Sequence, residues 1–343
     1  MAKLISFKPK NVTKKLLTDL QDRAHDVIVS RYGLNEEERK TLENIGEKYN
    51  ITRERVRQIE NAAIVLIRKS PSFKENATIF SELEDILSSM GNVVGEEELL
   101  NTLSKDKVTQ NHIHFFLVLG DMFTKHKEDE NFKSRWATKK DVAESVHTAL
   151  KKVYTSLTDD ELVGESEIIT KFLEELKDLN EQYKDEEALR RWLSFSKMLA
   201  CNPLGEWGKA TSGNVKTRGI KDYAYLIMRK HGSPMHFREV AKAIELTFCK
   251  KTHTATCHNE LIKDKRFVLV GRGMYALSEW GYKSGVVRDV IQDILKKKGP
   301  LPKEEVVDQV LKERYLKRNT ILVNLQNAKY FKKNKNGLYS LAS

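Results

Sequence analysis

Apolar positions follow a helical period in two neighbouring segments near the N-terminus. Residues 41–49 repeat apolar side chains at spacings of three and four, which predicts a short helix. A tight connection follows, and Thr52 suits the N-cap of a second helix because its hydroxyl can accept a free backbone N–H. The expected apolar face of the second helix is Val56, Ile59, Ala63, Leu66 and Ile67. Two helices joined this tightly predict a helix-turn-helix, whose second helix enters the DNA major groove.

The opposite face of the second helix is polar. It carries Arg53, Glu54, Arg57, Gln58 and Asn61. Arg suits guanine, Gln suits adenine and Glu suits the cytosine amine, so this face holds side chains able to discriminate bases. An ordinary amphipathic helix with a solvated charged face is the alternative interpretation.

The second half of the chain repeats itself. The segment HGSPMHFREVAKAI (231–244) aligns with KGPLPKEEVVDQVL (298–311), and KDKRFVLVGRGMYALSEW (263–280) aligns with NAKYFKKNKNGLYSLAS (327–343). Each copy has a Gly/Pro turn, a helix, and an aromatic residue before a Gly-containing turn and a short strand. Helix, turn, two helices and a hairpin predict a winged helix, with Tyr275 and Tyr339 at equivalent positions 64 residues apart.

Fainter copies of this pattern lie upstream. Residues 91–103 and 159–173 each resemble a turn plus the second helix of such a unit, and residues 131–140 and 202–211 resemble wings. An irregular helical linker domain is the alternative for this region. The expected fold class is mainly α with small β-hairpin wings, an N-terminal helix-turn-helix preceding tandem winged-helix-like domains. The expected divisions are a basic arm (1–19), the helix-turn-helix (20–77), two acidic units (78–145 and 146–212) and two basic winged helices (213–284 and 285–343).

Charge is unevenly distributed along the 343 residues, whose net charge is +11. Residues 1–77 carry +5, residues 78–210 carry −9 and residues 211–343 carry +15. Two basic regions suit a polyanion, and the acidic region between them repels one. Although a single Lys-rich face is usually just solvated, +15 on the C-terminal region makes nucleic acid the first partner to consider.

No run of about 18 apolar residues predicts a membrane span, and the N-terminus does not resemble a secretory signal. The three cysteines do not form a disulfide framework, which fits a reducing compartment. We therefore expect a soluble protein of the cytoplasm, associated with the nucleoid and without a membrane partner. Its oligomeric state is left open.

The N-terminal motifs resemble region 4 of the primary bacterial sigma factors. The matching pieces are RYGL (31–34), TLENIG (41–46) and TRERVRQIE (52–60), a specific combination within about residues 20–70. The resemblance implies a helix-turn-helix that recognises the −35 element of double-stranded promoter DNA and sits on the β flap of RNA polymerase. Carried over, Arg53, Glu54, Arg57 and Gln58 become the expected base contacts. Arg55, Thr41 and Leu42 become expected phosphate contacts.

Two departures from that family matter. After the IE pair the chain continues NAAIVLIRK, where the family usually has more Lys and Arg, so we expect fewer phosphate contacts. Only about 25 residues precede the motif, and the family's parts for the polymerase clamp and the melted −10 strand are missing. The sequence thus predicts a sigma-like DNA-binding protein rather than a free-standing initiation factor.

Residues 222–282 resemble the HARE-type helix-turn-helix, a winged fold also found in the δ subunit of bacterial RNA polymerase. The matching residues are HGSPMHFREVAKAI and RFVLVGRGMYALSEWG. The resemblance implies a polymerase- or chromatin-associated module that contacts DNA without catalysis. The candidate phosphate contacts are Lys250, Lys251, Lys263, Lys265, Arg266, Arg272, Lys317, Arg318, Lys332, Lys333 and Lys335, with His253 and Asn319 beside them.

No enzyme motif accompanies these modules: P-loop, GxSxG, HExxH and GxGxxG patterns do not occur. Cys249, His253, Cys257 and His258 have spacings that zinc sites use, but they fall where a winged helix needs its third helix. Packing is the favoured interpretation, so neither a metal nor another cofactor is expected.

Two functions are therefore weighed. The favoured one is a sequence-specific transcription regulator that recognises a −35-like element and binds flanking DNA through its winged helices. The alternative is a polymerase-bound adaptor on the β flap, whose acidic middle region acts as a protein interface or DNA mimic.

Overall fold

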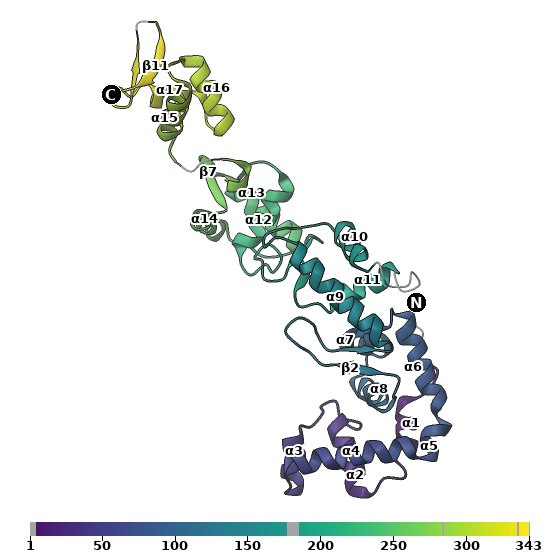
Figure 1. Cartoon of the computed structure of the whole chain (residues 1–343). Helices are drawn as coiled ribbons and strands as arrows, with labels where there is room; N and C mark the ends of the chain where they lie inside the picture. The colour runs from purple at the N-terminus through teal and green to yellow at the C-terminus, as the bar shows by residue number, and fades with distance from the viewer. Residues whose placement is uncertain (1–4, 177–184, 283–284, 335, 343) are drawn as a thin grey trace. The chain divides into compact units, whose positions relative to one another are not determined.

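The computed structural model describes residues 5–176, 185–282, 285–334 and 336–342 (Figure 1). The chain divides into two compact units. The first comprises Met1–Cys201 and Gly205–Thr211, and the second comprises Asn202–Leu204 and Ser212–Ser343. Helices predominate and the strands form small antiparallel sheets, which confirms the mainly α fold class. In these described ranges no helix has the length and apolarity that a membrane crossing requires.

The first unit begins with short helices around the expected helix-turn-helix. They are α1 (Pro9–Leu16), α2 (Asp22–Tyr32), α3 (Leu42–Tyr49), α4 (Arg53–Lys69) and α5 (Pro71–Glu75). Val56, Ala63 and Ile67 on α4 are buried as predicted. The prediction for Leu66 is wrong, because its side chain is 59% exposed at the far end of α4.

After α5, one order of elements occurs four times in the described residues: a helix, a strand, two helices and two strands. We call each copy a module. The first module is α6 (Ala77–Ser89), β1 (Val93–Gly95), α7 (Glu96–Leu103), α8 (Lys107–Leu119), β2 (Thr124–His126) and β3 (Arg135–Ala137). The second module is α9 (Lys140–Ser156), a bridge at Val163, α10 (Glu165–Glu175), α11 (Glu186–Ser194), β4 (Leu199–Cys201) and β5 (Trp207–Lys209).

The second unit contains the other two modules. The third module is α12 (Ile220–His231), β6 (Met235–His236), α13 (Phe237–Phe248), α14 (Thr254–Lys263), β7 (Phe267–Gly271) and β8 (Met274–Leu277). A single 3-10 turn, η2 (Ser278–Trp280), follows it. The fourth module is α15 (Val287–Lys298), β9 (Leu301–Pro302), α16 (Lys303–Glu313), α17 (Arg318–Leu325), β10 (Phe331–Lys333) and β11 (Leu338–Leu341).

Strand order is also shared among the modules. The last strand lies in the middle of each three-stranded sheet, giving the orders β1-β3-β2, β6-β8-β7 and β9-β11-β10. In the second module β5 pairs with β4 and its Trp207 bridges to Val163, which reproduces this order with a single residue as first strand. The expected division at 145/146 falls inside α9, because that helix already begins at Lys140.

Candidate nucleic-acid interface

Local chemistry fixes the turn between α3 and α4. The hydroxyls of Thr41 and Thr52 each accept a backbone N–H in the first turn of the following helix, both at 3.2 Å. Asn50 ends α3 in the left-handed region with φ 51°, a conformation that Asn tolerates better than most residues. A side chain at Gly46 would place its Cβ 2.6 Å from the Ile51 carbonyl oxygen, so the close crossing requires glycine.

The expected base-contacting side chains lie on the outside of this crossing. Arg53, Glu54, Arg57 and Gln58 are all exposed in the first turns of α4. Positions three and four residues apart on a helix share a face, so Arg53 and Glu54 lie beside Arg57 and Gln58, and the four side chains form one polar surface. Arg55 is exposed as well, and Thr41 and Leu42 lie at the start of α3.

Neighbouring side chains pair with this surface. Arg53 lies 3.2 Å from the Glu43 carboxylate, and Arg57 lies 2.7 Å from that of Glu54. The hydrogen bonds from Arg57 lower the pKa of the Glu54 carboxyl, which keeps it charged. Arg55 donates to the side-chain carbonyl of Gln58 at 3.0 Å. These exposed pairs are weak, so contact with DNA can replace them at low free-energy cost.

Basic side chains accumulate on the third module. Lys251, Lys263, Lys265 and Arg272, four of the expected phosphate contacts, are exposed. The ammonium of Lys250 lies 4.3 Å from the centroid of the Tyr223 ring, and its side chain is half-buried.

The expectation for Arg266 does not fit the structure. Its guanidinium donates to Asp264 at 2.7 Å, Asp222 at 2.9 Å and the Asn214 side chain at 3.1 Å. Only 28% of the side chain is exposed. Arg266 therefore ties β7 to the start of α12 rather than offering its charge to phosphate.

The fourth module carries the remaining candidates. Lys317 precedes α17, Arg318 begins it and pairs with Glu304, and Asn319 follows. Lys332 and Lys333 are exposed on β10. Lys335 lies outside the described residues.

Two of the four residues in the cysteine and histidine segment are used for packing. Cys257 is fully buried on α14, and burial raises the pKa of its thiol to about 11. His258 stacks on Phe237 with ring centroids 4.2 Å apart, whereas His253 and Cys249 are exposed. Within the described residues, three or more potential metal ligands do not gather anywhere.

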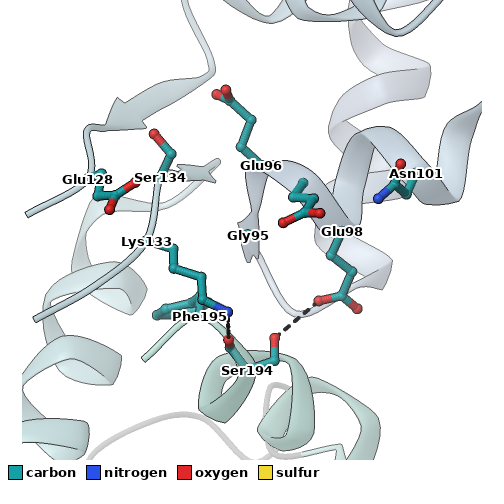
Figure 2. A pocket seen from close by; sticks show the side chains of 10 residues that line it. Gly95, Glu96, Glu98, Asn101, Glu128, Lys133, Ser134, Ser194 and Phe195 are labelled. Carbon is teal, nitrogen blue, oxygen red and sulfur yellow. Dashed lines mark hydrogen bonds between the residues drawn. The ribbon is translucent and has the colours of Figure 1, made fainter. Parts of the chain in front are cut away.

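Sequence patterns did not reveal an acidic pocket of about 380 Å³ in the first unit, formed by α7, the loop before β3 and the end of α11 (Figure 2). Its lining includes Glu96, Glu97, Glu98, Glu128 and Lys133. Figure 2 shows Glu98 turned toward the Ser194 hydroxyl, which donates to it at 3.4 Å. Glu96, Glu98 and Glu128 form ion pairs with Lys125, Arg191 and Lys197, so much of the negative charge of this lining is balanced by neighbouring cations.

Comparison with known proteins finds a similarity in the N-terminal part of the chain. Residues 16–69 match the family described as Sigma-70, region 4. The chain is 49% identical over 55 residues to RNA polymerase sigma factor SigA of Nostoc sp., which covers 16% of this chain and 14% of that protein. It is 48% identical over 61 residues to RNA polymerase sigma factor RpoD of Helicobacter pylori, covering 18% of this chain and 9% of that protein. The chain thus spans a seventh or less of these relatives, and the family match at residues 16–69 ends before the first module begins.

Proposed function

We propose that this protein is a DNA-binding, sigma-like transcription regulator that acts at initiation. The observation that carries the proposal is the exposed, base-discriminating surface on α4 within a segment similar to sigma region 4. Arg53, Glu54, Arg57 and Gln58 are its proposed base contacts in a −35-like element. Arg55, Thr41 and Leu42 are the proposed phosphate contacts beside them. Such a protein acts in the cytoplasm, at the nucleoid.

We also propose that the four modules are winged helices and that the second unit binds flanking DNA. Their helix and strand order supports this assignment, because the last two strands form the hairpin that a wing requires. The proposed phosphate contacts of the second unit are Lys250, Lys251, Lys263, Lys265, Arg272, Lys317, Arg318, Lys332 and Lys333. These charges add affinity without sequence preference. The division between the first two modules is placed at 139/140, where α9 begins.

A polymerase-bound adaptor is the second candidate. The net charge of −9 on residues 78–210 favours it, because an acidic region suits a basic protein partner. In that case RNA polymerase, through its β flap, is the partner of the helix-turn-helix, and DNA sequence is read elsewhere.

Selection of binding sites from random duplex DNA separates the two candidates. We expect the intact protein to enrich a short motif that an Arg53→Ala/Gln58→Ala double variant no longer enriches, since each good base contact contributes about 1–3 kcal/mol. Arg23→Ala is a matched control, because Arg23 is an exposed arginine of the same domain on α2. Salt-sensitive binding without any motif overturns the proposed regulator and favours the adaptor.

A further inference from the structure

Helix α8 is buried on all its sides. Nine of its thirteen residues are buried, in the unbroken run Gln110–Leu117 and at Leu119. The third helices of the other modules bury only one face each; α14, for example, buries Cys257 and Leu261. A helix is buried in this way only when other elements pack against both of its sides.

The second side of α8 is covered by the helix-turn-helix domain. One apolar core joins Ile28, Tyr32 and Ala63 of that domain to Ile113 and Phe116 of α8. The rings of Tyr32 and Phe115 lie 4.9 Å apart between centroids. The N-terminal domain and the first module therefore share one core.

Polar contacts set the geometry of this contact. The Asn111 side-chain amide donates to the carbonyl oxygens of Gly33 at 3.0 Å, Glu37 at 3.1 Å and Glu36 at 3.2 Å. Its side-chain oxygen accepts from Arg39 Nε at 2.8 Å. Asn111 is only 5% exposed, so these bonds are made away from water.

A second set of hydrogen bonds caps the C-terminal end of α8. Arg68, near the end of α4, donates to the carbonyl oxygens of Val118 and Leu119, both at 3.0 Å. These carbonyls lie in the last turn of α8, where helices leave them without intrahelical partners. The two ends of α8 thus hold the segment before α3 and the end of α4.

The segment that Asn111 binds leads directly into the helix-turn-helix. It spans residues 33–40 between α2 and α3, and Gly33 adopts φ 62° there. A Cβ at Gly33 would lie 2.7 Å from the Asn111 amide nitrogen, so glycine permits this close approach.

We propose that α8 acts as a built-in protein partner of the helix-turn-helix domain, and that Asn111 is the positioning residue that orders the segment leading into α3. In a winged helix the third helix is the element placed to meet DNA, whereas here its residues are enclosed by protein. The first module thus supports the base-contacting domain instead of binding DNA itself.

Hydrogen exchange of the full chain tests this role with a matched pair of variants. Asn111→Ala removes the bonds to the helix-turn-helix domain. Gln110→Ala, at the neighbouring buried amide, removes bonds to Asn101 and Ser104, both within the first module. We expect Asn111→Ala to speed amide exchange in residues 33–49 by about tenfold or more, and Gln110→Ala to leave that segment unchanged.

Equal effects of the two variants on residues 33–49, or no effect of Asn111→Ala, would overturn the proposal. Should Asn111→Ala not fold, Arg39→Met carries the same test, because it removes the Arg39–Asn111 bond from a half-buried position.

The consequence for DNA rests on the proposed function and is tested separately. With the selected site, Asn111→Ala is expected to weaken binding, because a smaller fraction of the molecules then holds the segment in its binding-competent conformation, and Gln110→Ala is expected to bind as the unchanged protein does. If the unchanged protein selects no motif, the proposed function fails while the exchange result still decides the role of α8. If it selects a motif and Asn111→Ala keeps both protection and affinity, only the role of α8 fails.

Discussion

Helices α8 and α14 occupy the same place in their modules and have opposite surroundings. α8 carries the run IHFFLVL and is enclosed between its own module and the helix-turn-helix domain. α14 buries Cys257 and Leu261 and leaves Thr254, Thr256 and Asn259 exposed beside basic residues. The contrast shows that a repeated backbone pattern does not fix a repeated role. A helix buried all round has a structural role, and a helix with a one-sided apolar stripe leaves its other face free to bind.

The largest expected effect comes from removing an aromatic ring at α8. Phe115→Ala empties a fully buried site and should lower the free energy of unfolding of the first unit by about 3–5 kcal/mol. The second unit should be unaffected, whereas Leu261→Ala on α14 should destabilise that unit alone. Calorimetry of the intact chain measures the unfolding temperature of each unit. If both variants lowered a single unfolding temperature shared by the two units, the two units would not unfold independently and the prediction would be contradicted.

A drop in pH should also lower the stability of the first unit through a buried histidine on α8. Burial, with Arg39, Lys125 and Arg31 nearby, lowers the pKa of His114 on α8 to about 2, even though the Glu96 carboxylate lies 3.7 Å away. Because the unfolded chain takes up this proton near pH 6.5 and the folded chain does not, stability falls as the pH drops below 6.5. The loss approaches about 1.4 kcal/mol per pH unit from this group.

Urea unfolding of the first unit at pH 7 and pH 5 measures that loss. His114→Gln should flatten the pH dependence, although His112 and His147 contribute in the same direction because burial lowers their pKa values too. An unchanged pH dependence in His114→Gln would show that His114 is not the group responsible.

A smaller effect is expected at the cap of α4. Thr52→Ala removes the hydroxyl that accepts the Arg55 N–H and should cost about 1 kcal/mol of local stability. Thr52→Ser keeps the hydroxyl and should behave as the unchanged protein. Hydrogen exchange at the first backbone amides of α4 measures the effect of each variant. Equal exchange rates in Thr52→Ala and Thr52→Ser would rule out a capping role.

The smallest effects per substitution are expected on the basic surface of the second unit. Lys251→Ala or Lys263→Ala should weaken binding to any duplex equally and reduce the slope of log affinity against log salt by about 0.9 each. Titrations at several salt concentrations measure both quantities. A loss confined to one DNA sequence would mean that these lysines contact bases instead.

Much of this arrangement could be predicted where local chemistry decides it. Thr41 and Thr52 mark the helix starts, and the repeated Gly/Pro turns and wing-like segments mark the modules because each module must bury the same apolar faces. The apolar run in α8 indicated burial and did not reveal what buries it. Its hydrogen bonds with the helix-turn-helix domain join residues 50 to 78 positions apart, a separation that periodicity does not register.

The two errors have related causes. Arg266 resembles a wing arginine, but its partner Asp222 lies 44 residues away and was not recognised. Leu66 lies outside the buried face of α4, which still includes Ile67 one residue further along. In both cases the local pattern was correct and the tertiary surroundings were missing.

Binding of the intact protein to its selected site and to a scrambled duplex, across a range of salt concentrations, tests the central claim most directly. The account predicts that the selected site binds at least about tenfold tighter, and that Arg53→Ala/Gln58→Ala removes this preference while the scrambled duplex keeps its affinity and salt slope. Equal affinity of the unchanged protein for the two duplexes at every salt concentration would contradict it.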